Sequence, residues 1–295
     1  MVKVHMSETA SAWALPESAG YRRQSARPMH RRPAGFDAQF DALTVIYDCF
    51  RVTPAQVMLI APPLNSFAGI LDSLVIQSLP SGSECSYEVE HKFTTAFAYR
   101  RTDNLCRIRV IVPESEVSLH LQSNAGTTVL DIRPQAGHLF RDRRVLFTLS
   151  KDNDPMWICD WMRFHRDLQS ADAVLLYDNG STAYTTQSLL EAMKQVAGFA
   201  VMRVVAWPYK YGPQGIGRGT WDSAFCQDGA MEDARWRFLG EARGVLNCDI
   251  DELALCHQGN LFDRAASSPS GCVRFPGRWV NTQQRKDAHL APRHT

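Results

Sequence analysis

Several features that would point directly to a function are missing from this sequence. It has no run of about 18 apolar residues, so it predicts no transmembrane helix. Its formal net charge is only +1, and no basic stripe alternates with aromatic residues, so a nucleic-acid partner is not expected. None of its eight cysteines forms a Cys-x-x-Cys pair or a Cys/His cluster with zinc-ligand spacing, which favours reduced thiols and a cytoplasmic location.

The composition itself is that of an ordinary globular protein. Hydrophobic residues make up 45% and charged residues 21% of 295 positions, enough for one large domain or two smaller ones. Residues 1–35 differ, because they combine five dispersed arginines with Ser, Ala and Pro and show no apolar periodicity. Their apolar cluster around Trp13 is too short for a signal peptide, so we predict a mostly disordered leader.

Two further regions are distinguished by the spacing of their apolar residues. Residues 36–142 alternate apolar and polar positions in short runs separated by turn residues, which predicts a β-rich domain, a small sandwich or barrel. Residues 143–295 alternate short apolar runs with amphipathic stretches, beginning with a strand at 145–149 and a helix at 155–168. This alternation predicts an α/β domain with a parallel sheet, whose ligands bind beyond the carboxyl ends of the strands.

Acidic residues follow two of the predicted strands. Strand 173–177 leads into Asp178-Asn179-Gly180-Ser181, and strand 244–248 is followed directly by Asp249-Ile250-Asp251-Glu252. In an extended stretch, side chains two apart point the same way, so both aspartates of the second segment are expected to face one cleft. Adjacent carboxylates repel each other, and Mg²⁺ or Mn²⁺ completed by substrate phosphates would offset that cost. The alternatives are a surface Asp-x-Asp without a ligand and an ordinary Asn-Gly turn.

The order of these motifs resembles one known group of enzymes. The segments concerned are Lys151-Asp152-Asn153-Asp154, Trp157-Ile158, Asp160-Trp161, Phe164-His165, Tyr177-Asp178-Asn179-Gly180-Ser181 and Asp249-Ile250-Asp251-Glu252. They resemble the family 92 type glycosyltransferases, which have Lys-Asn-Glu after the first strand, a Glu-Trp-Ile-x-Tyr-His helix, Tyr-Asp-Asn-x-Ser ending the second strand and a later Asp-x-Asp-Glu. Family 2 glycosyltransferases share the pattern more loosely. The resemblance spans residues 143–295, and its first motif is one residue longer here.

The resemblance implies a GT-A fold, a Rossmann-like domain that binds a nucleotide-sugar donor with Mn²⁺ or Mg²⁺. The implied activity is transfer of a sugar, from a uridine-diphosphate type donor, to a hydroxyl of a glycan acceptor, as in polysaccharide synthesis. By position, Asp251 becomes the main metal ligand, Asp249 binds metal or ribose, and Asp178 binds the nucleoside. The other implied donor contacts are Lys151, Asn153 and Asn179. Trp161 and His165 are assigned to packing.

The same resemblance implies inversion at the anomeric carbon, which requires a carboxylate base near the acceptor hydroxyl. The candidates are Glu252, beside the metal motif, and Asp287. His294 is a candidate for a late metal ligand, with a solvated tail as the alternative. Because the sequence ends at Thr295, 43 residues after Glu252, we expect a GT-A domain that is incomplete at its C-terminal end.

Two other classes of function remain open from the sequence. A chain that keeps the fold but lacks the acceptor half would be a non-catalytic binding module. A metal-dependent phosphoester hydrolase also places Asp-x-Asp after a strand, but near the start of its fold and followed by Thr or Val. Here Glu252 follows the motif and three predicted strands precede it in the domain, which favours the transferase.

Overall fold

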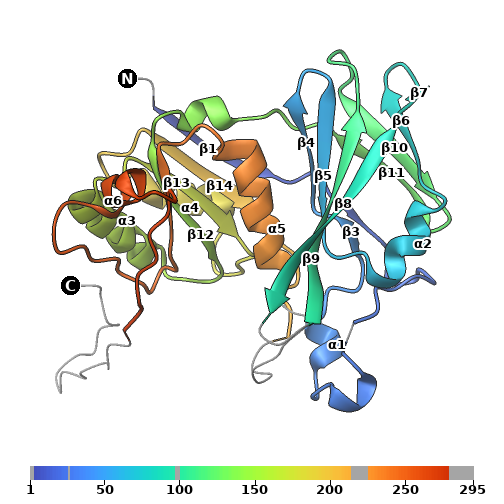
Figure 1. Ribbon diagram of the computed structural model, residues 1–295, viewed down its shortest axis with the longest axis horizontal. Coiled ribbons are helices and arrows are strands. Elements are labelled where there is room, and N and C mark those ends of the chain that lie inside the picture. Colours follow the sequence, from blue (N-terminus) through green and yellow to red (C-terminus); the bar gives the residue numbers. More distant parts are fainter. Residues whose placement is uncertain (1–2, 26, 97–99, 214–224, 279–295) are drawn as a thin grey trace.

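The structure, a computed structural model, describes residues 3–25, 27–96, 100–213 and 225–278, without the side chains of residues 92–104. Within these ranges an α/β part with a parallel sheet lies beside a β-rich part with antiparallel sheets (Figure 1). The predicted combination of a parallel α/β sheet with a β-rich region is confirmed at this level.

The described strands of the α/β part form a five-stranded, all-parallel sheet in the order β1-β14-β13-β12-β15. The strands are β1 (Val4–Thr9), β12 (Arg144–Ser150), β13 (Ala173–Asp178), β14 (Val201–Ala206) and β15 (Gly244–Asn247). β13 is buried along its whole length, which explains its continuous apolar sequence, because a central parallel strand is covered on both faces.

Helices cover both faces of this sheet. They are α3 (Pro155–Gln169), α4 (Thr186–Met193), α5 (Phe225–Asp233), which continues as the π-helix η4 (Ala234–Phe238), and α6 (Leu261–Ser267). One apolar core joins α3, α4 and α6 to the face that carries Leu146 and Val174. A second core joins α5 and η4 to the opposite face, which carries Phe147 and Tyr177.

The N-terminus of α3 matches its predicted start. Asp154 is the N-cap residue, and its carboxylate accepts a hydrogen bond from the backbone N–H of Met156 at 2.8 Å. Pro155 follows in the first turn, where its missing N–H removes no helical hydrogen bond. The helix therefore begins immediately after the loop that follows β12, at the carboxyl edge of the sheet.

The described strands of the β-rich part form a sandwich of two four-stranded antiparallel sheets, with the orders β11-β10-β6-β7 and β4-β5-β9-β8. The strands are β4 (Asp48–Thr53), β5 (Gln56–Ala61), β6 (Val75–Leu79), β7 (Ser83–Glu84), β8 (Tyr87–Ala96), β9 (Arg100–Ile111), β10 (Ser118–Ser123) and β11 (Gly126–Asp131). The smaller elements are the paired strands β2 (Trp13–Ala14) and β3 (Thr44–Ile46), the helices α1 (Phe36–Gln39) and α2 (Ala68–Leu71), and the 3-10 turns η1 (Met29–Arg31), η2 (Asn65–Phe67) and η3 (Gly137–Phe140).

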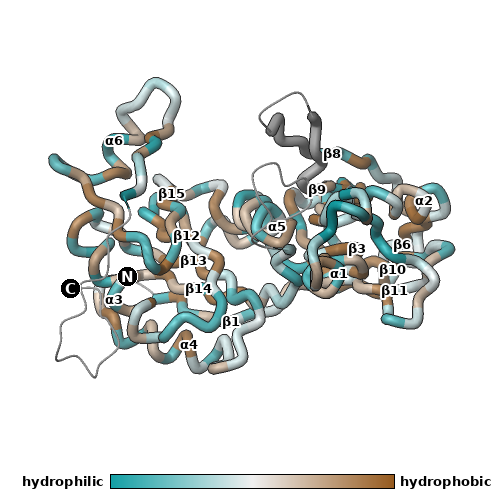
Figure 2. Tube along the Cα trace, turned by 90° about the horizontal axis from the view of Figure 1, so that it is seen from below, coloured by the Kyte–Doolittle hydropathy of each residue, from teal (hydrophilic) through white to brown (hydrophobic). Residues whose placement is uncertain are grey.

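Strand β5 connects the sandwich to the α/β part. Successive side chains of a strand point to opposite faces. Val57 and Leu59 belong to the core of the sandwich, whereas Met58 and Ile60 belong to the core that contains α5 and Phe147. Figure 1 shows α5 lying between the two parts, and Figure 2, turned by 90°, shows hydrophobic segments along the strands of both. The two parts therefore share an apolar interface.

The prediction of a disordered leader over residues 1–35 is wrong for the residues that the structure describes there, 3–25 and 27–35. β1 adds in parallel to β14 with Val4 opposite Val201, and thus completes one edge of the sheet. Arg23 is buried, and its guanidinium donates to the backbone carbonyls of Pro63, Asp41 and Thr44. These partners lie far along the chain, so the local composition of the segment gave no sign of them.

A buried ion-pair network also joins the two parts. Arg237 Nη1 lies 2.9 Å from Asp48 Oδ2, and Arg237 Nη2 lies 2.5 Å from Glu8 Oε2. These residues come from η4, β4 and β1. Asp233, on α5, is fully buried beside them and accepts a hydrogen bond from the hydroxyl of Tyr177. Burial, and then the charge of Asp48, raises the pKa of Asp233 well above its ordinary value.

None of the described helices is long and apolar enough to cross a membrane, in agreement with the sequence. No disulfide forms among the eight cysteines, all of which lie in the described part of the chain. Six of the eight are buried, as small apolar side chains usually are.

The raised pKa of Asp233 predicts a pH-dependent stability. The folded protein keeps this proton at pH values where an unfolded aspartate has lost it, so unfolding releases a proton and stability falls as pH rises above the ordinary aspartate range. Asp233→Asn mimics the protonated form, and we expect it to raise the melting temperature at pH 8 by about 2 to 4 °C. Thermal unfolding between pH 5 and pH 8 measures this.

The matched control is Asp72→Asn, which changes an exposed carboxylate of the sandwich. It should leave the difference in melting temperature between pH 5 and pH 8 as in the unaltered protein. A lower melting temperature of Asp233→Asn at pH 8 would contradict a protonated Asp233.

Candidate functional site

The sheet order places a possible ligand crevice between β12 and β15. From β12 the chain steps to β13 and then to β14 on one side, and β15 then returns to pair with the other side of β12. In open parallel sheets, ligands bind beyond the carboxyl ends of the strands at this kind of topological switch. The loop after β12 and the acidic segment after β15 both leave the sheet at that edge.

The acidic segment after β15 is a tight turn. The backbone N–H of Glu252 donates to the carbonyl of Asp249 at 3.0 Å, and Glu252 Oε2 accepts from the backbone N–H of Asp249 at 3.0 Å. Ile250 is 3% exposed and packs in the core under α3, whereas Asp249 and Asp251 are exposed. The segment is therefore turned rather than extended, but it still buries Ile250 and leaves both aspartates outside.

The carboxylates of this turn influence one another. Partial burial raises the pKa of Asp249, and the nearby charges of Glu252 and then Asp251 raise it further. Such repulsion is relieved when a cation lies among the carboxylates. The electrostatics of the acidic turn are compatible with a divalent ion.

No three His, Cys, Asp or Glu side chains of the described residues converge on one point as a ready-made metal site. Asp249 and Asp251 supply hard oxygen ligands from one side only. That arrangement fits Mg²⁺ or Mn²⁺, which commonly bind through one or two carboxylates and complete their coordination with water and substrate phosphates. The predicted base Asp287 and the predicted metal ligand His294 lie outside the described residues.

Hydrogen bonds connect the loops after β12 and β13. Asp152 Oδ1 accepts from the backbone N–H groups of Thr182 at 2.6 Å and Ala183 at 3.1 Å, and these bonds lower the pKa of Asp152. The backbone N–H of Asp152 donates to Ser181 Oγ at 2.8 Å. Beside it, Lys151 is exposed and carries its ammonium group at the same edge. The extra residue of this motif thus cross-links two loops.

Asn153 and Asp178, two predicted donor-binding residues, lie at the ends of β12 and β13. Asn153 is half-buried, and its amide donates to Ser150 Oγ at 2.9 Å. Asp178 is 5% exposed and accepts from both the hydroxyl and the backbone N–H of Ser181. Burial raises the pKa of Asp178, and the charge of Lys151 opposes that rise. The joint role of Lys151 and Asp178 in binding a donor stays a prediction.

Asn179 has a different role from the predicted donor contact. Its side chain is 4% exposed, and its amide donates to the carbonyls of Trp207 and Tyr209, both at 2.8 Å. It also lies 3.2 Å from Cys226 Sγ. Because this amide is already engaged, Asn179 links the end of β13 to the loop after β14 and is not presented to a ligand.

Tyr211 is a residue at this edge that the sequence did not single out. It is half-buried, and its hydroxyl donates to Gln227 Oε1 at 2.9 Å. Burial, and then the charge of Asp249, raises the pKa of Tyr211. The only available signal was its position at the start of a Gly-rich loop, most of which falls in residues 214–224, outside the described ranges.

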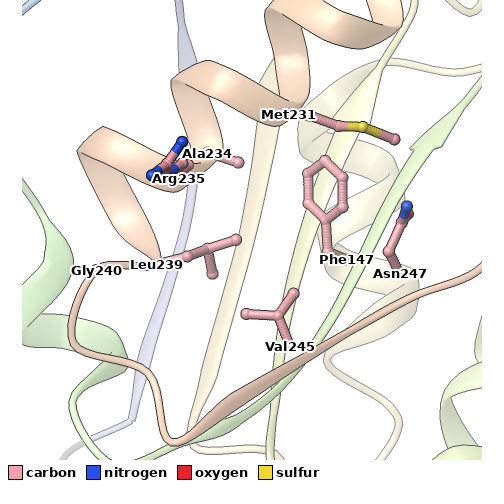
Figure 3. A pocket seen from close by; sticks show the side chains of 8 residues that line it. All are labelled: Phe147, Met231, Ala234, Arg235, Leu239, Gly240, Val245 and Asn247. Carbon is pink, nitrogen blue, oxygen red and sulfur yellow. The ribbon is translucent and has the colours of Figure 1, made fainter. Parts of the chain in front are cut away.

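An apolar pocket of about 350 Å³ lies along the edge of the sheet, away from the carboxylates of the turn. In Figure 3, Phe147, Val245 and Asn247 face it from the sheet, while Met231 and Leu239 face it from α5 and the end of η4. Its lining includes one charged residue, Arg235, and no carboxylate. It is therefore unsuited to hold a cation.

The buried amide of Asn179 predicts a structural effect. Asn179→Ala leaves the carbonyls of Trp207 and Tyr209 without this donor, and we expect the free energy of unfolding to fall by about 2 to 3 kcal/mol. Urea unfolding followed by tryptophan fluorescence measures this. Asn153→Ala, which loses one half-buried hydrogen bond, is the matched control, with an expected loss of about 1 kcal/mol or less. Equal losses in the two variants would exclude a special structural role for Asn179.

Comparison with known proteins does not place this chain in a family. No family model matches the sequence, and no curated protein matches it significantly.

Proposed function

We propose that this chain is a metal-dependent glycosyltransferase domain of the GT-A type, which binds a nucleoside-diphosphate sugar and transfers the sugar to a hydroxyl of a glycan. One observation carries the proposal. The acidic turn of Asp249 to Glu252 leaves β15 at the carboxyl edge of a parallel sheet, directly across the topological switch from the loop after β12. The order of motifs that resembles family 92 type glycosyltransferases, of which this acidic segment is one, also supports the proposal.

In this proposal the two sides of the switch bind different parts of the donor. Asp251 is the main metal ligand and Asp249 the second, because both are exposed on a turn that is anchored by buried Ile250. A divalent ion bound there would act as a Lewis acid and neutralise the charge that develops on the leaving diphosphate. On the other side, Lys151, which is exposed, and Asp178 at the end of β13 would recognise the nucleoside.

Glu252 takes a supporting role in this arrangement. Its Oε2 accepts from the backbone N–H of Asp249, so its carboxylate closes the turn that presents the metal ligands. A general base must approach the acceptor hydroxyl within hydrogen-bonding distance. Glu252 would have to break the bond inside the turn to do so with the same oxygen. We therefore assign it first to the shape of the turn.

The proposal is tested by titrating uridine diphosphate into the purified chain by calorimetry, with and without Mn²⁺. We expect Mn²⁺-dependent binding, and Asp251→Asn should weaken it by about 100-fold or more because a first ligand is lost. Asp72→Asn, which removes an exposed carboxylate of the sandwich, is the matched control and should bind as the unaltered chain does.

Three outcomes separate the alternatives. Metal-dependent binding followed by transfer of sugar to a glycan supports the transferase. Metal-dependent binding with neither transfer nor hydrolysis of a sugar nucleotide supports a non-catalytic binding module. Binding that is absent, or that is equal in Asp251→Asn and the unaltered chain, contradicts the assignment of the acidic turn.

A further inference from the structure

Two buried polar side chains on α3 face the segment that follows the acidic turn. His165 and Gln169 are one helical turn apart, so they lie on the same side of α3. His165 is 0% and Gln169 is 1% exposed. Burying polar groups this deeply costs free energy unless they are hydrogen-bonded. Their hydrogen-bond partners therefore indicate which segment of the chain they fix in place.

The hydrogen bonds of His165 define its tautomer. The backbone N–H of Ala254 donates to His165 Nε2 at 3.1 Å, so Nε2 must be the unprotonated acceptor. The proton is then on Nδ1, which donates to the carbonyl of Trp161 at 2.9 Å. Cys248 Sγ, at the end of β15, lies 3.8 Å from the same Nε2. The neutral imidazole thus contacts the chain immediately before and shortly after the acidic turn.

Gln169 holds the same segment at two further points. Its Nε2 donates to the carbonyl of Ala254 at 2.8 Å, and its Oε1 accepts from the backbone N–H of Leu261 at 2.8 Å. His165 and Gln169 together therefore satisfy both backbone groups of Ala254, which is 4% exposed. The segment from 254 to 261 has no regular secondary structure of its own until α6 begins, so these side chains replace the backbone pairing that a strand or helix would provide.

The acidic turn is consequently fixed on both sides. Before it, β15 pairs with β12, and Ile250 packs in the core beneath α3. After it, the backbone of Ala254 is held by two side chains of one helix. An exposed turn between two such anchors has little freedom to move its carboxylates apart, although they repel each other.

We propose that His165 and Gln169 form a clamp that positions the carboxylates of Asp249 and Asp251 for a divalent cation. They are positioning residues: they touch the backbone beyond the turn and act on the cation through it. Their role in metal binding rests on the proposed function. Their role in fixing the position of the turn does not depend on it. Outer partners that orient metal ligands typically change metal affinity by about 10- to 100-fold when they are removed.

The experiment compares the unaltered chain with three variants. His165→Leu removes the acceptor for Ala254 and keeps an apolar side chain. His165→Gln can place an oxygen near the position of Nε2 and is the conservative rescue. Leu189→Ala, a cavity in the same apolar core but on α4, is the control for a general loss of stability. Each form is measured by amide hydrogen exchange without ligand, and by calorimetry with Mn²⁺ and uridine diphosphate.

The clamp predicts a local effect. In His165→Leu the amides of Glu252 and Ala254 should exchange roughly tenfold or more faster, beyond any change common to all core amides. The Mn²⁺-dependent affinity for uridine diphosphate should fall by about 10- to 100-fold. His165→Gln should restore most of both properties. Leu189→Ala should raise exchange across the core but leave the affinity of the folded protein within about twofold.

The two measurements separate the clamp from the proposed function. Exchange at Glu252 and Ala254 that rises no more in His165→Leu than in Leu189→Ala would overturn the clamp, whatever the binding result. Local exchange that rises as expected in a chain that binds no Mn²⁺ and uridine diphosphate would support the clamp and reject the metal site. Equal affinities of His165→Leu and the unaltered chain would overturn the positioning role.

Discussion

The buried guanidinium of Arg237 is the contact on which the arrangement of the two parts depends. It is held by Asp48 of the sandwich and Glu8 of the N-terminal strand, and it is almost completely removed from water. The apolar contact between β5 and α5 can tolerate small shifts, but a buried cation that loses a carboxylate partner is strongly destabilising. We infer that this ion network, more than the apolar packing, fixes how the sandwich is set against the parallel sheet.

This constraint extends to the candidate site because η4, which carries Arg237, leads through a short loop into β15. The backbone carbonyl of Arg237 also accepts from the N–H of Ala136, the residue before η3 in the segment that leads to β12. β12 and β15 are the strands that flank the topological switch. The acidic turn is thus supported from both faces of the sheet, by the sandwich and η4 on one face and by α3 on the other. The β-rich part, for which the sequence gave no role, helps to hold the site.

The sequence predicted those elements whose signal is local. Parallel strands buried on both faces, such as β13, are continuous apolar runs, and α3 has an apolar stripe with its cap and proline in place. The sequence also placed Asp249 and Asp251 directly after a strand of the parallel sheet, where the structure has them. The failures share one cause, which is partners remote in sequence. β1 becomes a sheet strand only by pairing with β14, which lies far along the chain. The hydrogen bonds of Asn179 to Trp207 and Tyr209 could not be predicted either, because an Asn-Gly pair usually marks a turn.

The pairing of β1 with β14 also affects how the chain reaches its final form during synthesis. β1 is synthesised long before β14, its only pairing strand in the described sheet, which is not available until Val201 to Ala206 have been added. Closing so long a loop is entropically slow compared with assembling β12, α3 and β13, which are neighbours in the chain. β1 is thus made before the other strands of the described sheet but is among the last of them to join it. Until then its backbone remains open to chaperones and to unwanted pairing with other edge strands.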